Sequence, residues 1–270
     1  EQAVKPVDDQ FVLLVNPYPI LPVHFTVPLR SHCPQSVLRH YAELYRLIEL
    51  YPDLMVFYNG PKCGASAPDH LHFQAGSSGL LPLQTEWHRL RRETETVIKG
   101  DNGSTVSYSN DYTVPIFIIE CHKPDDGVAL FRKLYAAMPI RDGETEPMMN
   151  IVAWYSGESF VSVVIPRRKH RPDCYYAKGE SQMLISPGAL DMAGLVVMPR
   201  ENDFVKAQPH KIIAAIKECG ITDAEGSDIA DNLKKENDNT TLCDCFGGKQ
   251  PIVSVGIVSG SCIDFSLNGP

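Results

Sequence analysis

The segment that decides the fold is Asn59-Gly-Pro-Lys-Cys-Gly-Ala-Ser-Ala-Pro-Asp-His-Leu-His-Phe-Gln74. It places His70, His72 and Gln74 at strict two-residue spacing. Side chains on a strand alternate between its two faces, so these three are predicted to share one face while the apolar residues between them pack on the other. We therefore predict a strand over residues 68–74 that presents a polar triplet from a rigid support.

The residues before this strand are short and rich in glycine, a composition typical of a site for an anion. Gly64, Ala65 and Ser66 leave main-chain amides accessible, and Lys62 adds a positive charge. An imidazole is nucleophilic near neutral pH and can carry a phosphoryl or nucleotidyl group covalently. The alternative is a pair of strand histidines that serves structure or binds a metal. The glutamine that follows and the Gly-Ala-Ser turn favour the chemical interpretation.

The motif His70-Leu-His-Phe-Gln74 resembles the H-x-H-x-Q signature of the transferase branch of the histidine-triad (HIT) superfamily. This branch includes galactose-1-phosphate uridylyltransferase, diadenosine tetraphosphate phosphorylase and the GDP-hexose phosphorylases, and the form of the motif is closest to the last. Residues 11–28 are similar to the strand, turn and strand that precede the motif in the superfamily. Residues 149–204 resemble, more weakly, the second half of phosphorylase-type members and a bacterial family of unknown function found in Bacteroidetes, DUF4922.

The resemblance implies a role for each residue of the motif. His72 would be the nucleophile that attacks the α-phosphate, and His70 would orient neighbouring groups through hydrogen bonds. Gln74 would donate to a phosphate oxygen, while Ser66 and the amides around Gly64 and Ala65 would hold the departing or incoming phosphate. The further candidates for nucleotide binding are Asn59, Lys62, Arg167 and Lys169, the last two within a basic cluster that would supply counter-charges.

By this resemblance the chain is expected to be a nucleotidyltransferase of phosphorylase type. A nucleoside diphosphate sugar or dinucleoside polyphosphate would form a nucleotidyl-histidine intermediate, and phosphate or a sugar phosphate would accept the nucleotide. Glutamine in place of a third histidine marks members that transfer the nucleotide. Two alternatives stay open: a histidine-triad hydrolase, and a non-catalytic module that binds a nucleotide or a sugar phosphate.

Composition sets limits on partners and location. The net charge of −8 and the pI near 5.6 argue against a nucleic-acid partner, because binding a phosphate backbone needs a cationic stripe. No apolar stretch of about 18 residues is present, so no membrane span is predicted. The eight cysteines form no C-x-x-C pair, which predicts reduced thiols in the cytoplasm and no metal site. No cofactor is predicted, metal dependence is left open, and a homodimer is compatible with the family.

The pattern of elements predicts an α+β fold, with a HIT-like antiparallel sheet flanked by helices and built from two related halves. Further strands are predicted over residues 11–15, 24–28, 54–58, 112–120, 151–155, 160–165 and 195–198, and helices over 35–50, 86–99, 125–138 and 202–219, the last broken at Pro209.

Two domains joined by a linker are expected. Residues 1–220 would form the nucleotidyltransferase domain, with part of that fold upstream of residue 1. Residues 221–250 are predicted to be a polar linker. Residues 251–270 resemble the opening of a SpoIID/LytB-type domain and would begin a second domain that continues beyond Pro270.

Overall fold

The structure is a computed structural model that describes residues 4–245, with side chains from Lys5 to Asn237 except that of Pro6. By internal contacts the chain divides into two units, Glu1–Asn237 and Asp238–Pro270. The sheet and the site discussed below belong to the first unit. In the second unit only the main chain of residues 238–245 is described, as the end of a helix.

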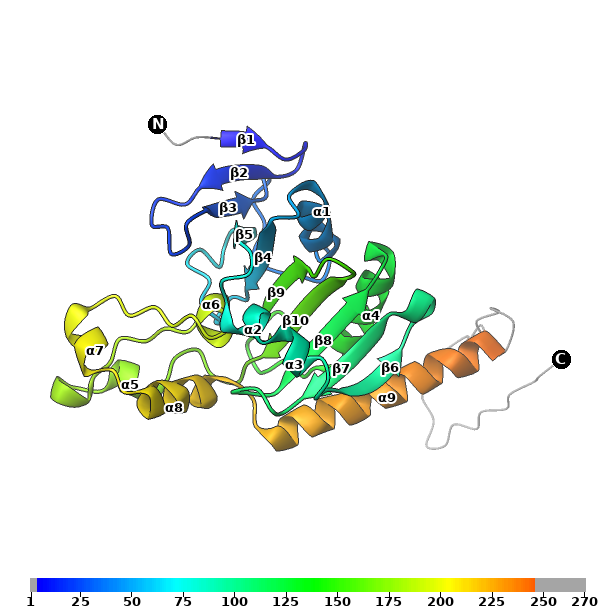
Figure 1. The fold of residues 1–270 in the computed structure, drawn as a ribbon. Helices are drawn as coiled ribbons and strands as arrows, with labels where there is room; N and C mark the ends of the chain where they lie inside the picture. The colour runs from blue at the N-terminus through cyan, green and yellow to red at the C-terminus, as the bar shows by residue number, and fades with distance from the viewer. Residues whose placement is uncertain (1–3, 246–270) are drawn as a thin grey trace, which may run out of the picture. The chain divides into compact units, whose positions relative to one another are not determined.

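One antiparallel sheet of ten strands organises the first unit, in the order β1-β2-β3-β5-β4-β9-β10-β8-β7-β6 (Figure 1). The strands are β1 (Val4–Pro6), β2 (Val12–Val15), β3 (His24–Pro28), β4 (Leu54–Asn59), β5 (His72–Ser77), β6 (Glu95–Lys99), β7 (Thr105–Ser109), β8 (Ile116–Cys121), β9 (Met149–Tyr155) and β10 (Phe160–Pro166). The first five strands form one half and the last five the other, joined by the pairing of β4 with β9.

Helices cover both faces of the sheet, which gives the α+β architecture that the sequence predicts. They are α1 (Ala42–Leu50), α2 (Pro82–Thr85), α3 (Trp87–Leu90), α4 (Pro124–Ala137), α5 (Asp173–Tyr176), α6 (Ala189–Met192), α7 (Glu201–Lys206), α8 (Pro209–Cys219) and α9 (Asp223–Cys245). Helices α1 and α4 pack on one face, where Tyr41 stacks on Phe131 with ring centroids 3.7 Å apart. Helix α6 packs against β4 and β9 on the other face.

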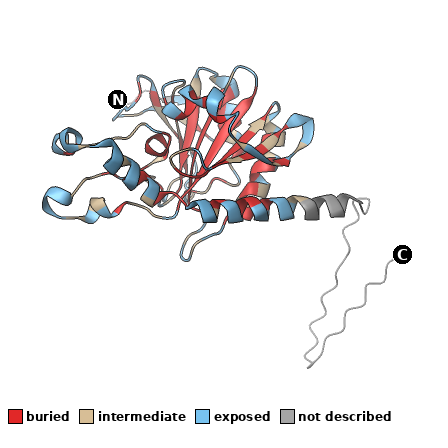
Figure 2. Ribbon diagram, turned by 60° about the horizontal axis from the view of Figure 1, so that its bottom comes forward, coloured by how far each residue is buried: buried red, intermediate tan, exposed pale blue. Residues whose placement is uncertain are grey.

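The two faces of the sheet bury separate apolar cores, and buried residues concentrate along its strands (Figure 2). Successive residues of one strand enter opposite cores: Tyr58 packs with α1 and α4, whereas Phe57 packs with α2, α3 and α6. On β5, Phe73 belongs to the first core. The alternation therefore directs the side chains of His72 and Gln74 toward the face that carries α6.

Several predicted elements match the structure. Strands at 11–15, 24–28, 54–58, 151–155 and 160–165 and the helix at 125–138 all appear within a few residues of their expected bounds. The break at Pro209 is confirmed, since α7 ends at Lys206 and α8 begins at the proline. A proline is well placed there because the first turn of a helix needs no main-chain donor at that position.

The prediction of a helix over residues 86–99 was wrong. Only Trp87–Leu90 is helical, and Glu95–Lys99 forms β6, which pairs with β7. Residues 195–198, predicted as a strand, form no strand, and Val197 instead donates its main-chain N–H to Asp191. The predicted helix over 35–50 begins only at Ala42, because the preceding residues are held by hydrogen bonds to the sheet and to Glu146.

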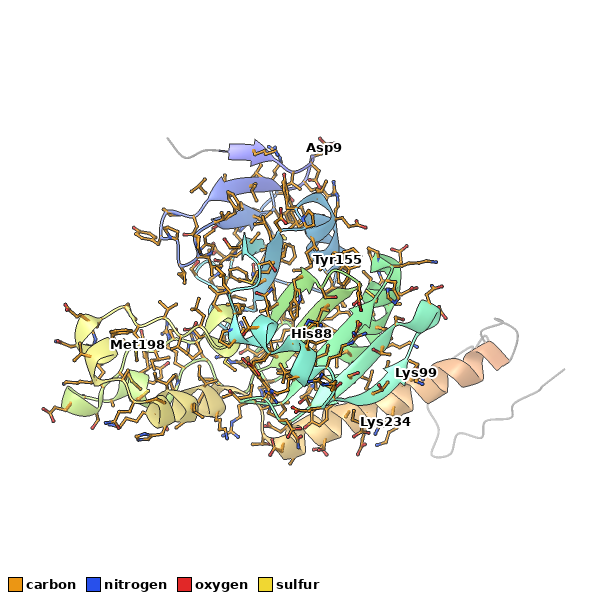
Figure 3. All side chains as sticks on the ribbon, in the orientation of Figure 1. Asp9, His88, Lys99, Tyr155, Met198 and Lys234 are labelled. Atoms are coloured by element: carbon orange, nitrogen blue, oxygen red, sulfur yellow. The ribbon has the colours of Figure 1, made fainter. Side chains whose placement is uncertain are left out.

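Residues 223–245, within the predicted linker, are helical. Ile229, Ala230 and Leu233 of α9 are buried against the core, and Lys234, labelled in Figure 3, pairs with Glu95 of β6. The overall composition of this segment is polar, but these three apolar residues lie on one face of the helix and pack against the core. The division at residue 220 stays a prediction, and the second domain predicted over 251–270 lies outside the described residues. Within those residues, no helix is long and apolar enough to cross a membrane.

A buried carboxyl group beneath the sheet links the loop before α1 to β4. Tyr58 donates its hydroxyl to Glu146 at 2.5 Å, and Val37 donates its main-chain N–H to the other carboxyl oxygen at 2.9 Å. Burial raises the pKa of Glu146 to about 7, and the two hydrogen bonds oppose this rise.

We expect this group to make stability depend on pH. Because the pKa is raised in the folded state, the folded protein holds a proton that the unfolded chain releases, and stability falls as the pH rises from about 4.5 to about 7. The change should be about 3 kcal/mol. Urea unfolding at pH 5 and pH 8 should show a markedly smaller difference for Glu146→Gln than for the unsubstituted protein. An equal difference in both proteins would contradict this assignment.

Candidate functional site

A cavity of about 280 Å³ lies on the α6 face of the sheet, at the ends of β4 and β5. Its polar lining comes from Asn59, Ser66, Gln74, Ser186 and Asp191. Its apolar lining comes from Ile20, Phe57, Leu184, Ala189, Leu190, Val197 and Pro199. Apolar walls with a few convergent polar groups are typical of a small-molecule site.

A larger cavity of about 360 Å³ lies among α5, α7 and α8 and is lined by Cys174, Lys206 and Glu218, among others. None of the residues predicted from the sequence as site residues lines it. Four of those residues, Asn59, Gly64, Ser66 and Gln74, line the smaller cavity. The smaller cavity is therefore the candidate site.

His72 is the first residue of β5 and is 5% exposed. Its Nδ1 lies 2.9 Å from the main-chain oxygen of His70. A carbonyl oxygen only accepts hydrogen bonds, so Nδ1 carries the proton and Nε2 of the neutral ring keeps its lone pair. Within the described residues Nε2 forms no hydrogen bond. The ring does not itself line the cavity but lies two residues from Gln74 on the same face of β5.

Gln74 is held by a histidine that sequence reasoning missed. His24 Nδ1 accepts the main-chain N–H of Ile20 at 3.1 Å, so its proton lies on Nε2, which donates to Gln74 Oε1 at 2.8 Å. Burial lowers the pKa of His24, which favours this neutral form, although the bond to Gln74 opposes the shift. Because Oε1 is the acceptor, the amide nitrogen of Gln74, a residue of the cavity lining, is left as a donor.

The position of His70 in the structure differs from the prediction. The motif strand begins at His72, and His70 lies in the preceding turn. Its Nε2 donates to the main-chain oxygen of Leu29 at 2.6 Å, and its Nδ1 lies 3.1 Å from Nδ1 of His32. The predicted triplet on one face is therefore a pair, and the contact between the two motif histidines runs through the carbonyl of His70.

The loop that carries Gly64 packs directly against the loop before α6. Gly64 has φ of +96°, and a Cβ atom there would lie 2.5 Å from Cα of Gly188. Glycine is thus required at position 64 by both its positive φ and the lack of space for a Cβ atom. The same two loops are joined through Asn59, whose Oδ1 accepts hydrogen bonds from the main chain of Ala189 and from Asn150, at 2.7 and 2.9 Å. Ser66 is exposed at the cavity wall, whereas Ala65 does not line it.

The predicted basic residues lie outside this lining. Arg167 is 2% exposed, and its guanidinium donates to Asn150 Oδ1 and to the main-chain oxygens of Cys219, Pro187, Lys169 and His170. These five bonds use all five N–H groups of a guanidinium, so none is left for a phosphate.

Both predicted lysines form ion pairs with carboxylates. Lys62 pairs with Glu144, and Lys169 pairs with both Asp173 and Glu218. Arg171 donates instead to Ser186 in the cavity lining, at 2.8 Å, and stacks over the ring of Tyr175. We therefore leave Arg167, Lys62 and Lys169 out of the proposal for substrate contacts.

No group of three or more His, Cys, Asp or Glu side chains suited to a metal occurs among the described residues. Sequence reasoning missed His24, which contacts Gln74 of the motif, and Ser186 and Asp191, which line the cavity. His24 lies on β3, and only the pairing of β3 with β5 brings it to Gln74; nothing in the sequence indicated His24, Ser186 or Asp191.

The sheet and its flanking helices define a HIT-like fold. The structure resembles crystal structures of yeast Ap4A phosphorylase Apa2, with a TM-score of 0.55 and 17% identity, covering 80% of this chain and 74% of that one. The same enzyme in complex with Ap4A gives a TM-score of 0.53 and 16% identity, covering 80% and 75%. Its complex with AMP gives a TM-score of 0.53 and 17% identity, covering 80% of this chain and 76% of that one. At these identities the likeness shows the fold.

A family model described as "Domain of unknown function (DUF4922)" matches residues 1–77. The match covers β1 to β5 and thus includes His24, His72 and Gln74. Both resemblances predicted from the sequence are confirmed, the one to HIT-like phosphorylases at the level of the fold and the one to DUF4922 over residues 1–77 rather than over the predicted residues 149–204. Among proteins of curated function, none matches this chain.

Proposed function

We propose that this chain is a nucleotidyltransferase of phosphorylase type that works through a nucleotidyl-histidine at His72. The observation that carries the proposal is the fixed ring of His72, with its proton on Nδ1 and its lone pair on Nε2, on the strand face that leads to the cavity. The named neighbours are an Ap4A phosphorylase and its complexes with Ap4A and AMP, which supports a nucleotide as the ligand.

The first half-reaction forms a bond between Nε2 of His72 and the α-phosphorus of a nucleoside diphosphate sugar or a dinucleoside polyphosphate. The bond from that phosphorus to the leaving oxygen breaks, and a sugar phosphate or nucleoside polyphosphate departs. The ring becomes positively charged while the proton stays on Nδ1. The carbonyl of His70 stabilises this charge, and the freed amide nitrogen of Gln74 and the hydroxyl of Ser66 donate to phosphate oxygens.

In the second half-reaction an oxygen of inorganic phosphate or of a sugar phosphate attacks the same phosphorus. The bond to Nε2 breaks, the electron pair returns to the ring, and a nucleoside diphosphate or nucleotide sugar leaves. Dividing one displacement into two at a nucleophilic side chain is the general advantage of covalent catalysis. A cytoplasmic location and a homodimer remain predictions that accompany this proposal.

Intact-mass spectrometry tests the proposal. We expect the protein mixed with Ap4A or with a nucleoside diphosphate sugar, without phosphate, to gain the mass of one nucleoside monophosphate, and the adduct to be labile to acid. Added phosphate should remove the adduct and release a nucleoside diphosphate. Release of a nucleoside monophosphate at a rate independent of phosphate would identify a hydrolase. Saturable nucleotide binding without any adduct would identify a binding module and overturn the proposal.

A further inference from the structure

Gln35 is a glutamine in the loop between β3 and α1 whose side-chain amide lies between the ends of β4 and β5. Its exposed fraction is 0%. Its Oε1 accepts the main-chain N–H of His72 at 2.9 Å, and its Nε2 donates to the main-chain oxygens of His72 and Asn59 at 3.0 and 2.8 Å. One amide group therefore holds both strand ends at the candidate site.

The amide stands where the two strands would otherwise pair with each other. The register of β4 with β5 ends at Phe57 opposite Gln74, and its continuation would place Asn59 opposite His72. Paired strands lie about 4.8 Å apart, which leaves no room for an inserted amide. The strands must therefore separate at this point, and Gln35 fills the gap with the donor and acceptor that a main chain would have offered.

The other neighbour of His72 offers no substitute. Pro28 of β3 stands opposite His72 in the register and has no N–H group. The main-chain N–H and C=O of a strand residue point to the same side, which for His72 is the side of Gln35. The position of His72 therefore depends on a side chain 37 residues earlier in the sequence.

We propose that Gln35 is a positioning residue that holds the main chain of His72, and with it the ring. The ring hydrogen bond from Nδ1 reaches the carbonyl of His70 in the same main-chain segment, so a shift of the main chain at His72 alters this bond. The expected effect of Gln35 on the rate of adduct formation rests on the proposed function. Its effect on the position of the His72 ring does not. A displacement of about 1 Å at a reacting group costs about 100-fold in rate.

The test compares Gln35→Leu with Gln84→Leu. Gln84 is also a buried glutamine, and it holds the loop after β5 through Gly79 and Ser78, away from the cavity lining. Both variants lose buried hydrogen bonds, so both should unfold at lower temperature. We expect Gln35→Leu to slow formation of the His72 adduct about 100-fold at unchanged KM. Gln84→Leu should stay within about twofold, because its contacts do not reach His72.

A second measurement needs no activity. NMR of protein labelled with ¹⁵N-histidine reports the tautomer of each ring. The signals of His72 are assigned by their absence in His72→Ala. They should show the Nδ1–H tautomer in the unsubstituted protein and in Gln84→Leu. Gln35→Leu should shift this ring toward the Nε2–H form. If the unsubstituted protein forms no adduct while Gln35→Leu changes the tautomer, the proposed function fails and the positioning role stands. An unchanged tautomer in folded Gln35→Leu overturns the positioning role.

The variant Gln35→Glu adds a pH signature that a purely structural role does not produce. A protonated carboxyl group supplies one acceptor and one donor, so it replaces part of the amide, whereas the ionised form faces two carbonyl oxygens without a donor. Adduct formation by Gln35→Glu should therefore approach that of the unsubstituted protein at low pH and fall as the pH rises, relative to the profile of the unsubstituted protein. A pH profile of Gln35→Glu that runs parallel to that of the unsubstituted protein would contradict the inference.

Discussion

Replacement of His72 by alanine is expected to abolish the nucleotidyl adduct and to lower turnover by about 10⁴-fold or more, while nucleotide binding changes little. The loss is large because the covalent route disappears altogether when its nucleophile is removed. Adduct formation is measured by intact mass, turnover by release of nucleoside diphosphate in the presence of phosphate, and binding by calorimetry. The separation of binding from chemistry is the result that identifies the ring as the nucleotide carrier.

The control for this substitution is His88→Ala. His88 lies on α3, outside the cavity lining, and is labelled in Figure 3. It should retain full adduct formation, which excludes a general effect of losing a histidine. His70→Ala should lose far less than His72→Ala, because the contact to the nucleophile comes from the main-chain carbonyl of His70, which alanine keeps. Adduct formation by His72→Ala at an unaltered rate would refute the assignment of the nucleophile.

Replacement of Gln74 by leucine should lower the rate of adduct formation by about 10² to 10³-fold, the usual effect of removing one preorganised donor to developing negative charge. The substitution keeps the side chain as far as Cδ but removes the amide nitrogen that His24 leaves free. The rate is measured by rapid quench at saturating nucleotide, so that the effect on chemistry is separate from that on binding. A loss confined to KM would show that Gln74 only binds.

The partner of Gln74 gives this prediction an internal control. His24→Phe keeps a ring in the core but removes the donor that fixes the amide, so a smaller loss of about tenfold is expected because the amide then turns freely. The double variant should be no slower than Gln74→Leu alone, since the two residues act through one group. Additive losses would contradict the role of His24 in orienting Gln74.

Local patterns predicted much of the sheet because each central strand is a short run of apolar residues bounded by turns. The strands at 54–58, 151–155 and 160–165 are of this kind. Patterns failed where tertiary pairing overrode them: Glu95–Lys99 is a strand because β7 pairs with it, and Gln35 is outside α1 because two strands hold its amide. The sequence also misled at Arg167. Its charge suggested that it binds a phosphate, but in the structure its N–H groups donate to main-chain oxygens such as those of Pro187 and His170.

The sequence by itself determined that His72 and Gln74 share a strand face and that a glycine loop precedes them, because alternation along a strand and the conformational freedom of glycine are local properties. Only the tertiary structure decided which nitrogen of His72 carries the proton, which end of the Gln74 amide is held by His24, and which basic residues are already paired. These depend on partners such as His24, Gln35 and Glu144, which lie far away in the chain. Proton positions follow from hydrogen bonds, and hydrogen bonds follow from the fold.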